Sequence, residues 1–398
     1  MQQDRARRGG TSSALRLVEA DSDALSTALA QALAGGPAVA PLPPAPLERA
    51  QALAMLAPER PLEAGTAVVV ATSGSTGRPK GVLLSAAAVT ASVRATHDRL
   101  GGPGDWLLAL PAHYVAGLMV LARATVGGTR VGRTAADLSD LPEASERLDG
   151  RRYLSVVPTQ LARALDSPWL VEGLAGLDAV LVGGGPLPEP LADAARTAGI
   201  RVVTSYGMSE TCGGCVYDGV PLAGVEVALE ADGRVNLGGE VLFSGYRGRP
   251  DLTAAALADG RLRTADRARW DAGRLVVLGR VDDVVVSGGL NVDLAEVERA
   301  LRAWPGLAGS DVAVVGLPDP GWGTAVVAVV ERAGWSDEDT DALRDHVRER
   351  LPGYAAPRRV LGRERLPRTS SGKIDRLRIV AELRATGPAT DPTTGADA

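Results

Sequence analysis

Residues 71–82 read Ala71-Thr72-Ser73-Gly74-Ser75-Thr76-Gly77-Arg78-Pro79-Lys80-Gly81-Val82. Two glycines and four hydroxyl side chains precede the lysine, so backbone N–H groups and side-chain donors can point to one place, which suits phosphate oxygens. The spacing differs from the G-x-x-x-x-G-K-[ST] pattern of a P-loop. The apolar runs Ala67–Ala71 and Val82–Leu84 predict two strands. We therefore expect a phosphate-binding hairpin tip, with an ordinary polar turn as the alternative.

Lysine is almost absent from the chain. Of 43 Lys and Arg residues, only Lys80 and Lys373 are lysines. The second lies in Leu366–Arg376, another polar segment that contains glycine. The planar guanidinium group of arginine is a poor replacement where a compact ammonium charge is needed. We therefore predict that both lysines are functional.

Composition limits the classes of protein to consider. The 398 residues, 45% hydrophobic with a net charge of −5, are typical of a soluble globular protein of two domains and do not support nucleic-acid binding. No apolar run has the length of a membrane span, and residues 1–13 lack the apolar centre of a secretory signal. We expect a cytoplasmic protein without membrane insertion. The oligomeric state stays open, with a homodimer as one option.

The two cysteines form Cys212-Gly213-Gly214-Cys215. A zinc site would need two further ligands, and the three histidines show no ligand spacing to this pair. Two glycines also disfavour the helix start of a thioredoxin-type site. The prediction is a pair of reduced thiols in a tight loop.

Short strands and helices alternate through the first half of the chain, which indicates a layered parallel α/β core. Residues 1–20 are expected to be poorly ordered, and Pro37–Pro46 is expected to be a linker. His97 is expected to be solvated on a surface helix that Ser85 caps and that runs to Leu100. The other predicted elements are helix Asp23–Leu33, strands Leu107–Leu110, Arg152–Val157, Ala179–Val182 and Arg201–Thr204, and helices Thr159–Leu165 and Pro188–Ala198.

Ligands of such cores collect where strands end in loops. One strand leads into Gly183-Gly184-Gly185-Pro186, and another leads into Ser205-Tyr206-Gly207-Met208-Ser209-Glu210-Thr211. Glycines let a planar ring approach the backbone, the aromatic ring can stack, hydroxyls can donate, and the glutamate can bind a hard cation. A nucleotide with its magnesium ion accounts for all of these groups. The alternative to a nucleotide site is an ordinary strand and turn in which the hydrogen bonds of the glutamate are satisfied within the fold.

The second half of the chain predicts a small β subdomain from Val216 and then a compact α+β domain. The expected elements of this domain are helices Asp293–Ala303, Asp337–Leu351 and Ile374–Arg384 and strands Asp311–Val315 and Ala325–Glu331. The predicted domains are residues 1–280 and 283–385, with a disordered tail at 386–398.

From about Val68 to Leu383, these motifs resemble, in order, those of the adenylate-forming superfamily, which includes acyl-CoA synthetases, peptide synthetase adenylation domains and luciferases. The resemblance implies a large layered N-terminal α/β domain hinged to a smaller α+β domain. It also implies nucleotide-binding roles for Thr72, Ser73, Gly74, Ser75, Thr76, Gly77, Gly183, Gly184, Gly185, Tyr206, Gly207, Ser209, Thr211, Asp266 and Arg280. Lys80, Glu210 and Lys373 would be catalytic, with Glu210 serving magnesium.

Two departures narrow the resemblance. Thr264-Ala265-Asp266 replaces the usual T-G-D, and the phosphate loop begins unusually early. The early loop indicates a short member of the superfamily. The acid-pocket segments of this chain resemble those of short members that are o-succinylbenzoate–CoA ligases of menaquinone biosynthesis. By this resemblance the acid would meet His113 and Ser205, although a structural histidine is an equal alternative.

The implied reaction has two steps. A carboxylate attacks Mg-ATP to give an acyl-adenylate and pyrophosphate, and the thiol of coenzyme A then displaces AMP. In the superfamily the small domain rotates at a hinge, to which Asp282 corresponds. This rotation exchanges Lys373 for a CoA-binding face at Gly288 and Gly289. The alternatives are another aryl or acyl acid, a carrier-protein thiol, or a catalytically inactive nucleotide-binding module.

Overall fold

The computed structural model describes residues 15–72, 79–307, 309–369 and 372–385. The chain divides into two compact units. The larger is built from the described residues up to Glu230, with Val235–Thr264 and Trp270–Val276. The smaller contains Ala231–Arg234, Ala265–Arg269 and the described residues from Val277 onward. The predicted class, a large α/β unit and a smaller C-terminal unit, is confirmed. The boundaries at 280 and 283 and the hinge stay predictions.

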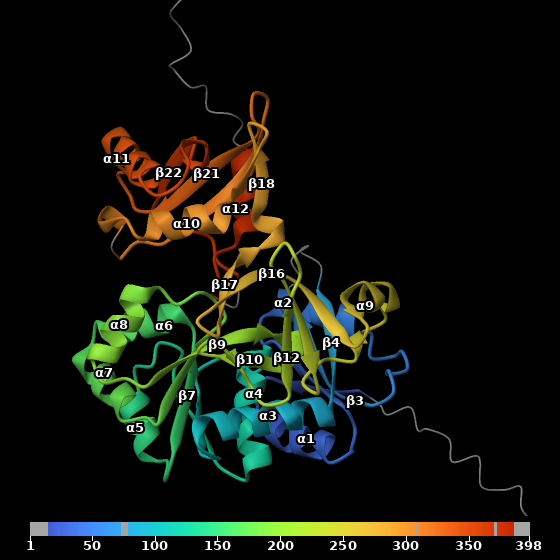
Figure 1. Cartoon of the computed structure of the whole chain (residues 1–398). Helices are drawn as coiled ribbons and strands as arrows, with labels where there is room; N and C mark the ends of the chain where they lie inside the picture. The colour runs from blue at the N-terminus through green and yellow to red at the C-terminus, as the bar shows by residue number, and fades with distance from the viewer. Residues whose placement is uncertain (1–14, 73–78, 308, 370–371, 386–398) are drawn as a thin grey trace, which may run out of the picture. The chain divides into compact units, whose positions relative to one another are not determined.

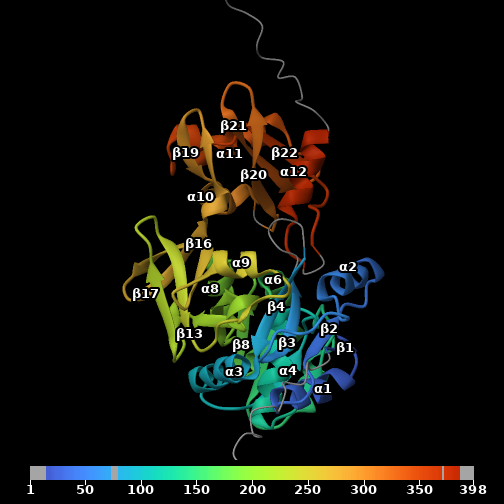
Figure 2. The same ribbon diagram turned by 90° about the vertical axis from the view of Figure 1, so that its right-hand side faces the viewer.

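A five-stranded sheet carries the predicted phosphate hairpin (Figure 2). Its strands are β1 (Arg16–Glu19), β2 (Val39–Leu42), β3 (Thr66–Thr72), β4 (Lys80–Ser85) and β14 (Gly245–Tyr246), in that spatial order. Antiparallel pairing of β3 with β4 ends with Thr72 opposite Lys80, so the predicted hairpin is confirmed. The expected tip residues Ser73, Gly74, Ser75, Thr76 and Gly77 lie outside the described residues.

Two expectations near the N-terminus were wrong. Residues 16–19, expected to be disordered, form β1, and the expected linker contains β2, which pairs with it in parallel. The cause is burial, because Ala38, Ala40 and Leu42 pack with the apolar face of α2 (Pro46–Leu56). Burial of apolar side chains outweighs the poor strand propensity of Pro41. Residues 1–14 and the expected tail at 386–398 lie outside the described residues.

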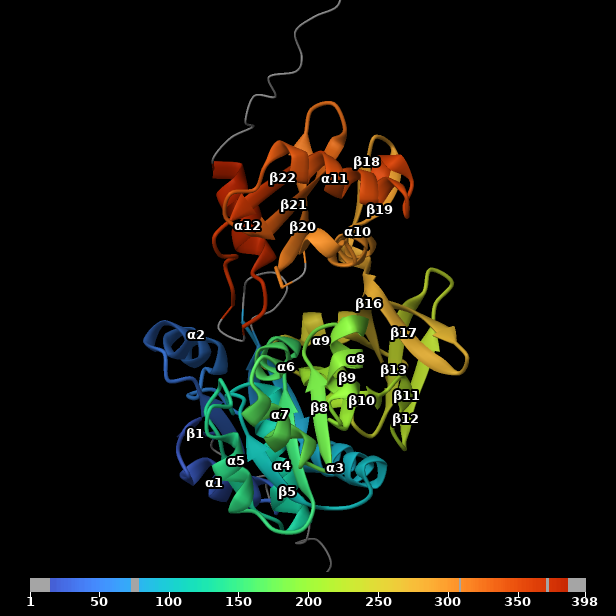
Figure 3. The same ribbon diagram turned by 90° about the vertical axis from the view of Figure 1, so that its left-hand side faces the viewer.

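A seven-stranded, mostly parallel sheet forms the centre of the large unit (Figures 1 and 3). In spatial order its strands are β11 (Val220–Pro221), β10 (Gly213–Tyr217), β9 (Val202–Met208), β8 (Ala179–Gly183), β7 (Arg152–Val156), β5 (Asp105–Leu108) and β6 (Val131–Arg133). Strands β5 to β9 pair in parallel, as the alternating pattern predicted. Strand β9 is longer than expected, so Ser205, Tyr206 and Gly207 lie within it and not in a loop.

Helices cover both faces of this sheet. They are α3 (Ala86–Leu100), α4 (Val115–Gly127), α5 (Leu141–Glu146), α6 (Pro158–Leu165), α7 (Pro168–Ala175) and α8 (Glu189–Thr197). Helix α1 (Ala24–Leu33) packs against α3 and α4. Helices α3 and α4 contact β10, and α1 and α3 also contact β3 of the five-stranded sheet. Helices α6 and α8 contact β8 and β9 from the other layer (Figure 3). The Ser85 hydroxyl accepts from Ala88 N, which confirms the predicted cap of α3.

A further sheet corresponds to the predicted β subdomain. Its strands are β12 (Val225–Leu229), β13 (Arg234–Gly239), β16 (Arg261–Asp271) and β15 (Leu257–Ala258), with β17 (Arg274–Arg280) beside β16. Helix α9 (Pro250–Ala256) precedes β15. Thr264, Ala265 and Asp266 lie within β16.

The C-terminal unit contains one sheet with helices on both faces. Its strands run β19 (Leu290–Asp293), β18 (Val284–Ser287), β21 (Gly323–Glu331) and β20 (Val312–Asp319), with β22 (Arg359–Arg363) beside β21. Its helices are α10 (Leu294–Arg302), α11 (Asp337–Arg348) and α12 (Arg376–Ala385). Alternate residues of β20 and β21 pack against α10 and α11 on one face and against α12 on the other. Within the described residues, no helix is long and apolar enough to cross a membrane.

Candidate functional site

The base of the phosphate hairpin lies beside an aromatic ring. Where the two strands enter the connecting loop, the Thr72 hydroxyl donates to the carbonyl oxygen of Lys80 at 3.3 Å. The ammonium group of Lys80 lies 5.2 Å from the centre of the Tyr246 ring. Tyr246 comes from β14, which pairs with β4 at Val82. The pairing therefore fixes the ring and the lysine on neighbouring strands.

Glu210 lies on a short 3₁₀ turn, Ser209–Thr211, directly after β9. Its carboxylate accepts a hydrogen bond of 2.8 Å from the hydroxyl of Tyr246. Its carbonyl oxygen accepts from Phe243 N at 2.8 Å. Tyr246 thus contacts both Lys80 and Glu210, two of the three predicted catalytic residues. No local sequence pattern indicated a role for Tyr246 in the site, because Tyr246 lies 36 positions from Glu210 in the chain.

Thr211 differs from expectation. Its side chain is fully buried, and its hydroxyl donates to Gly213 O at 2.7 Å while accepting from Met208 N at 2.9 Å. The hydroxyl that we expected to face a nucleotide therefore stabilises the turn that carries Glu210. The cause is the 3₁₀ turn, which directs this side chain into the core.

The glycine segment and the Tyr206 segment are adjacent because β8 and β9 pair, with Gly183 opposite Ser205. A Cβ atom on Gly183 would lie 3.2 Å from Ser205 O, and Gly184 has a φ of +80°. A side chain at Gly207 would meet Gly213 O at 2.1 Å, so the packing of β9 against β10 requires this glycine. The described backbone therefore brings together the segments that sequence assigned to adenine.

His113 follows β5 and precedes α4. It is 8% exposed, its ring packs on Tyr114 with 4.2 Å between centroids, and its Nε2 lies 3.9 Å from a carboxylate oxygen of Glu48 in α2. Within the described part of the chain, neither ring nitrogen has a hydrogen-bond partner. Burial lowers the pKa of His113, and Glu48 opposes this effect. The ring is therefore neutral near pH 7, and the alternative of a fully satisfied structural histidine loses support.

The residues assigned to ribose lie together in the smaller unit. Arg280 Nη1 lies 3.5 Å from Asp266 Oδ1, and Arg280 Nη2 donates to Asp282 Oδ2 at 3.0 Å. The carbonyl oxygen of Lys373 accepts from Thr369 N at 2.7 Å. Desolvation lowers the pKa of Lys373, Asp266 raises it, and Arg280 lowers it, with a net pKa below the ordinary value. These charges therefore act on one another within one unit.

Gly288 and Gly289 form the two-residue turn between β18 and β19, with φ angles of +59° and +80°. A Cβ atom on Gly288 would lie 2.4 Å from the ring of Trp322. The guanidinium of Arg358 lies 3.5 Å from the centroid of this ring. Glycine is thus required at position 288 by both backbone conformation and packing.

The donor set fits magnesium held by one carboxylate. Within the described residues, no cluster of three or more His, Cys, Asp or Glu side chains could hold a metal ion. Mg²⁺ characteristically binds one or two carboxylates together with substrate phosphates and water, so a single Glu210 is compatible with it. Cys212 and Cys215 are buried free thiols, and burial raises the pKa of both.

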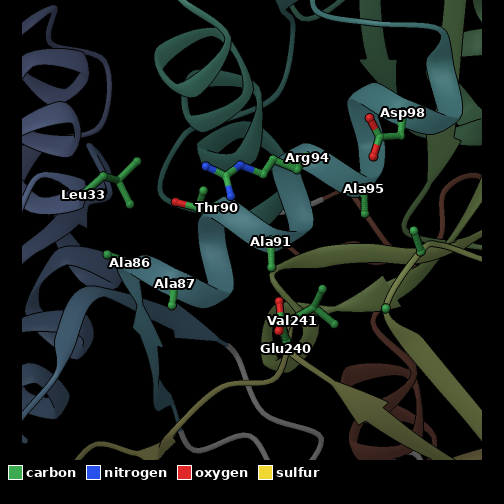
Figure 4. A pocket seen from close by; sticks show the side chains of 12 residues that line it. Leu33, Ala86, Ala87, Thr90, Ala91, Arg94, Ala95, Asp98, Glu240 and Val241 are labelled. Carbon is green, nitrogen blue, oxygen red and sulfur yellow. The ribbon is translucent and has the colours of Figure 1, made fainter.

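A cavity of about 570 Å³ opens on the outer side of α3 (Figure 4). It is lined mainly by small side chains of that helix, with Arg94, Asp98 and Glu240 as its charged groups. None of the predicted site residues lines it. We assign it no function, because the chemistry-bearing residues of the large unit converge elsewhere, on Tyr246.

Comparison with known proteins decides the family. The model of the AMP-binding enzyme family matches residues 11–247, and that of the AMP-binding enzyme C-terminal domain matches residues 296–373. The chain belongs to the AMP-binding enzyme family. This result confirms the superfamily resemblance that the motifs predicted.

Several proteins similar to this chain are named as ligases or synthetases of one acid. A protein of Mycobacterium tuberculosis (strain CDC 1551 / Oshkosh), named probable 2-succinylbenzoate–CoA ligase, is 49% identical over 325 residues, covering 79% of this chain and 84% of the relative. The o-succinylbenzoate CoA synthetase of Bacillus subtilis, solved with the acyl-adenylate intermediate, is 31% identical with a TM-score of 0.69, covering 81% and 71%. The same synthetase with ATP and magnesium is 29% identical with a TM-score of 0.68, covering 82% and 72%.

Proposed function

We propose that this chain is an ATP-dependent, AMP-forming acid–CoA ligase that acts on o-succinylbenzoate through an acyl-adenylate. The observation that carries the proposal is the convergence of Lys80 and Glu210 on Tyr246 in a chain of this family. The 49% identity to a protein named as a 2-succinylbenzoate–CoA ligase supports the choice of acid. Other aryl or acyl acids are the alternative within the same chemistry.

In the first step, the substrate carboxylate attacks the α-phosphorus of ATP and pyrophosphate leaves. Both reactants are anions, so charge neutralisation and positioning dominate catalysis. Thr72 and Lys80 at the hairpin base would hold phosphate oxygens. Mg²⁺, held by Glu210 and the phosphates, would supply further positive charge when bound. Asp266 and Arg280 would hold the ribose, and Lys373 would stabilise the charge that develops between carboxylate and α-phosphate.

In the second step, the CoA thiolate attacks the acyl carbon and AMP leaves. The family resemblance assigns CoA to the turn at Gly288 and Gly289 and the hinge to Asp282. We propose that rotation at this hinge separates the two steps, so Lys373 serves only the first. A Cβ atom on Gly289 would have no described atom within 4 Å, so the backbone there would be open to an extended thiol-bearing arm.

We infer that His113 and Ser205 contact the acid. A neutral buried imidazole can donate one hydrogen bond, and an incoming carboxylate would satisfy it. The cytoplasmic location follows as an inference from the substrates, since ATP and CoA are used there. A homodimer remains a prediction that light scattering tests.

The test measures ATP–pyrophosphate exchange and AMP release by the purified protein with ATP and Mg²⁺, over a panel of aryl and fatty acids. Saturable ATP–pyrophosphate exchange with o-succinylbenzoate in the absence of CoA, and release of AMP together with the CoA thioester once CoA is added, is the expected result. AMP formation with another acid alone would overturn the choice of substrate. No exchange with any acid, although ATP still binds, would support the inactive nucleotide-binding module instead.

A further inference from the structure

Tyr246 joins two groups that lie far apart in the sequence. Its hydroxyl donates to Glu210 Oε1 at 2.8 Å, and its ring lies beneath the Lys80 ammonium at 5.2 Å. The side chain is 8% exposed, so both contacts form in surroundings largely shielded from water. A charge-assisted hydrogen bond and a cation–π contact are both strengthened by such shielding.

The backbone around Tyr246 is fixed from two sides. Tyr246 N donates to the Thr253 hydroxyl at 2.9 Å, and Gly245, with a φ of +147°, leaves room for that same threonine. The ring of Phe243 packs edge-on against Tyr246 with 4.9 Å between centroids. Phe243 N also donates to the carbonyl oxygen of Glu210. Main-chain contacts, as well as the hydrogen bond between their side chains, therefore fix the position of Tyr246 relative to Glu210.

The hydroxyl of Tyr246 makes a directional contact with one side of the carboxylate. It donates to Oε1 of Glu210 at 2.8 Å. This hydrogen bond fixes the rotation of the carboxylate, so Oε2 is the oxygen that would bind a cation.

We propose that Tyr246 is a positioning residue of the phosphate site: its hydroxyl orients Glu210 towards magnesium, and its ring holds Lys80 beside the hairpin. This inference rests on the proposed function, because it assumes that Glu210 serves the metal of Mg-ATP. It adds a residue from β14 to a site otherwise built from β4 and the turn after β9.

The test separates the hydroxyl from the ring. Tyr246→Phe removes the hydrogen bond to Glu210 but keeps the aromatic face under Lys80, whereas Tyr246→Leu removes both. Tyr217→Phe is the matched control, because this fully buried tyrosine of the same unit bonds Thr96 and Arg123, away from the hairpin. The readouts are the Kd of a fluorescent ATP analogue with Mg²⁺ and with EDTA, the adenylation rate and the thermal midpoint.

For Tyr246→Phe we expect the Mg²⁺-dependent gain in ATP affinity and the adenylation rate to fall by roughly tenfold, as for loss of a hydrogen bond to a charged group. Binding in EDTA should stay unchanged, and Tyr217→Phe should match the wild type. Tyr246→Leu should weaken binding in EDTA as well, because Lys80 loses its support. In a Glu210→Gln background, Tyr246→Phe should cause no further loss of the Mg²⁺ effect.

Three results would overturn the inference. The first is a Tyr246→Phe protein with wild-type Mg²⁺ dependence of ATP affinity. The second is an equal loss of ATP affinity with Mg²⁺ and with EDTA, and the third is a similar loss in Tyr217→Phe; either would indicate a general effect of a lost buried hydroxyl. Failure of the proposed function is distinguishable, since the wild-type protein itself would then form no acyl-adenylate.

Discussion

A carboxylate oxygen of Glu48 lies 3.9 Å from Nε2 of the buried His113. The glutamate comes from α2, near the N-terminus, and the histidine from the segment between β5 and α4. This distance is beyond a hydrogen bond, so the carboxylate biases the ring electrostatically without saturating its nitrogens. The pair therefore links the N-terminal segment to the proposed acid pocket.

His113→Ala is expected to raise KM for the acid by on the order of tenfold, as for loss of one hydrogen bond to a carboxylate. KM for ATP and for CoA should change little. Steady-state kinetics with each substrate varied in turn measures this. His97→Gln, which removes another buried histidine of the same unit, is the control. Equal effects on all three substrates, or only a lower thermal midpoint, would assign His113 to the fold.

Asp266→Ala is expected to weaken ATP binding by roughly tenfold or more, because two ribose hydroxyls lose their shared acceptor. Titration of ATP by isothermal calorimetry measures the change. Asp232→Ala, at an exposed carboxylate that accepts from Arg234 N, should bind ATP normally. Unchanged affinity in Asp266→Ala would remove this residue from the nucleotide site.

Lys373→Arg keeps the charge but broadens the cationic group. We expect adenylation to fall by on the order of a hundredfold or more, typical of losing one preorganised donor. Thioester formation from supplied acyl-adenylate should be largely unaffected. Both half-reactions should be measured on one preparation. A near wild-type adenylation rate would contradict the argument from lysine usage, and a parallel fall in both would contradict separation of the two steps by domain rotation.

Arg247 is expected to be among the most costly charged side chains to remove from the large unit. Its side chain is 4% exposed, and its guanidinium donates to Glu63 and to four carbonyl oxygens at the end of α2 and just after it. Arg247→Ala should lower the free energy of unfolding by about 2–4 kcal/mol, because buried carbonyls lose their donors. Arg249→Ala, which breaks an exposed pair with Asp251, should cost far less, because water screens this pair. Urea denaturation distinguishes them, and equal costs would contradict the prediction.

The three histidines should make the stability of the protein fall with pH over a defined acidic range. Burial is the largest cause that lowers the pKa of His97, His113 and His346 below the ordinary 6.5. Above pH 6.5 both states are neutral at these sites; below it the unfolded chain binds protons that the folded protein does not, so stability falls as pH falls. We expect the thermal midpoint to drop between pH 7.5 and 5.5, with a smaller slope in His97→Gln. A flat profile over this range would contradict the prediction.

Sequence predicted those parts of the fold that local patterns determine. Continuous apolar runs predicted the strands around Thr72 and Lys80, and a serine with a glycine pair predicted both ends of α3. The order of the motifs assigned two segments to the nucleotide, which remains a prediction, and pairing of β8 with β9 brings these segments together.

The rest depends on contacts between distant segments. Strand β2 contains Pro41 and has only four residues, so only its burial against α2 and β3 explains its conformation. His97, expected to be solvated, is buried because the helix that carries it packs against α4, where Gly127 leaves space for the ring. Tyr246 was missed for the same reason, since the partner that reveals its role lies on another strand.

Both cysteines of the chain are buried, and thiol reagents at neutral pH react with thiolates, which a raised pKa suppresses. The native sequence is thus suited to site-specific labelling without prior removal of cysteines. Cysteines introduced at the exposed positions Glu172 in α7 and Glu338 in α11 could carry a donor and an acceptor dye, one in each unit. Energy transfer between the dyes, followed as acid, ATP and CoA are added in turn, would time any rotation of the units against the chemistry.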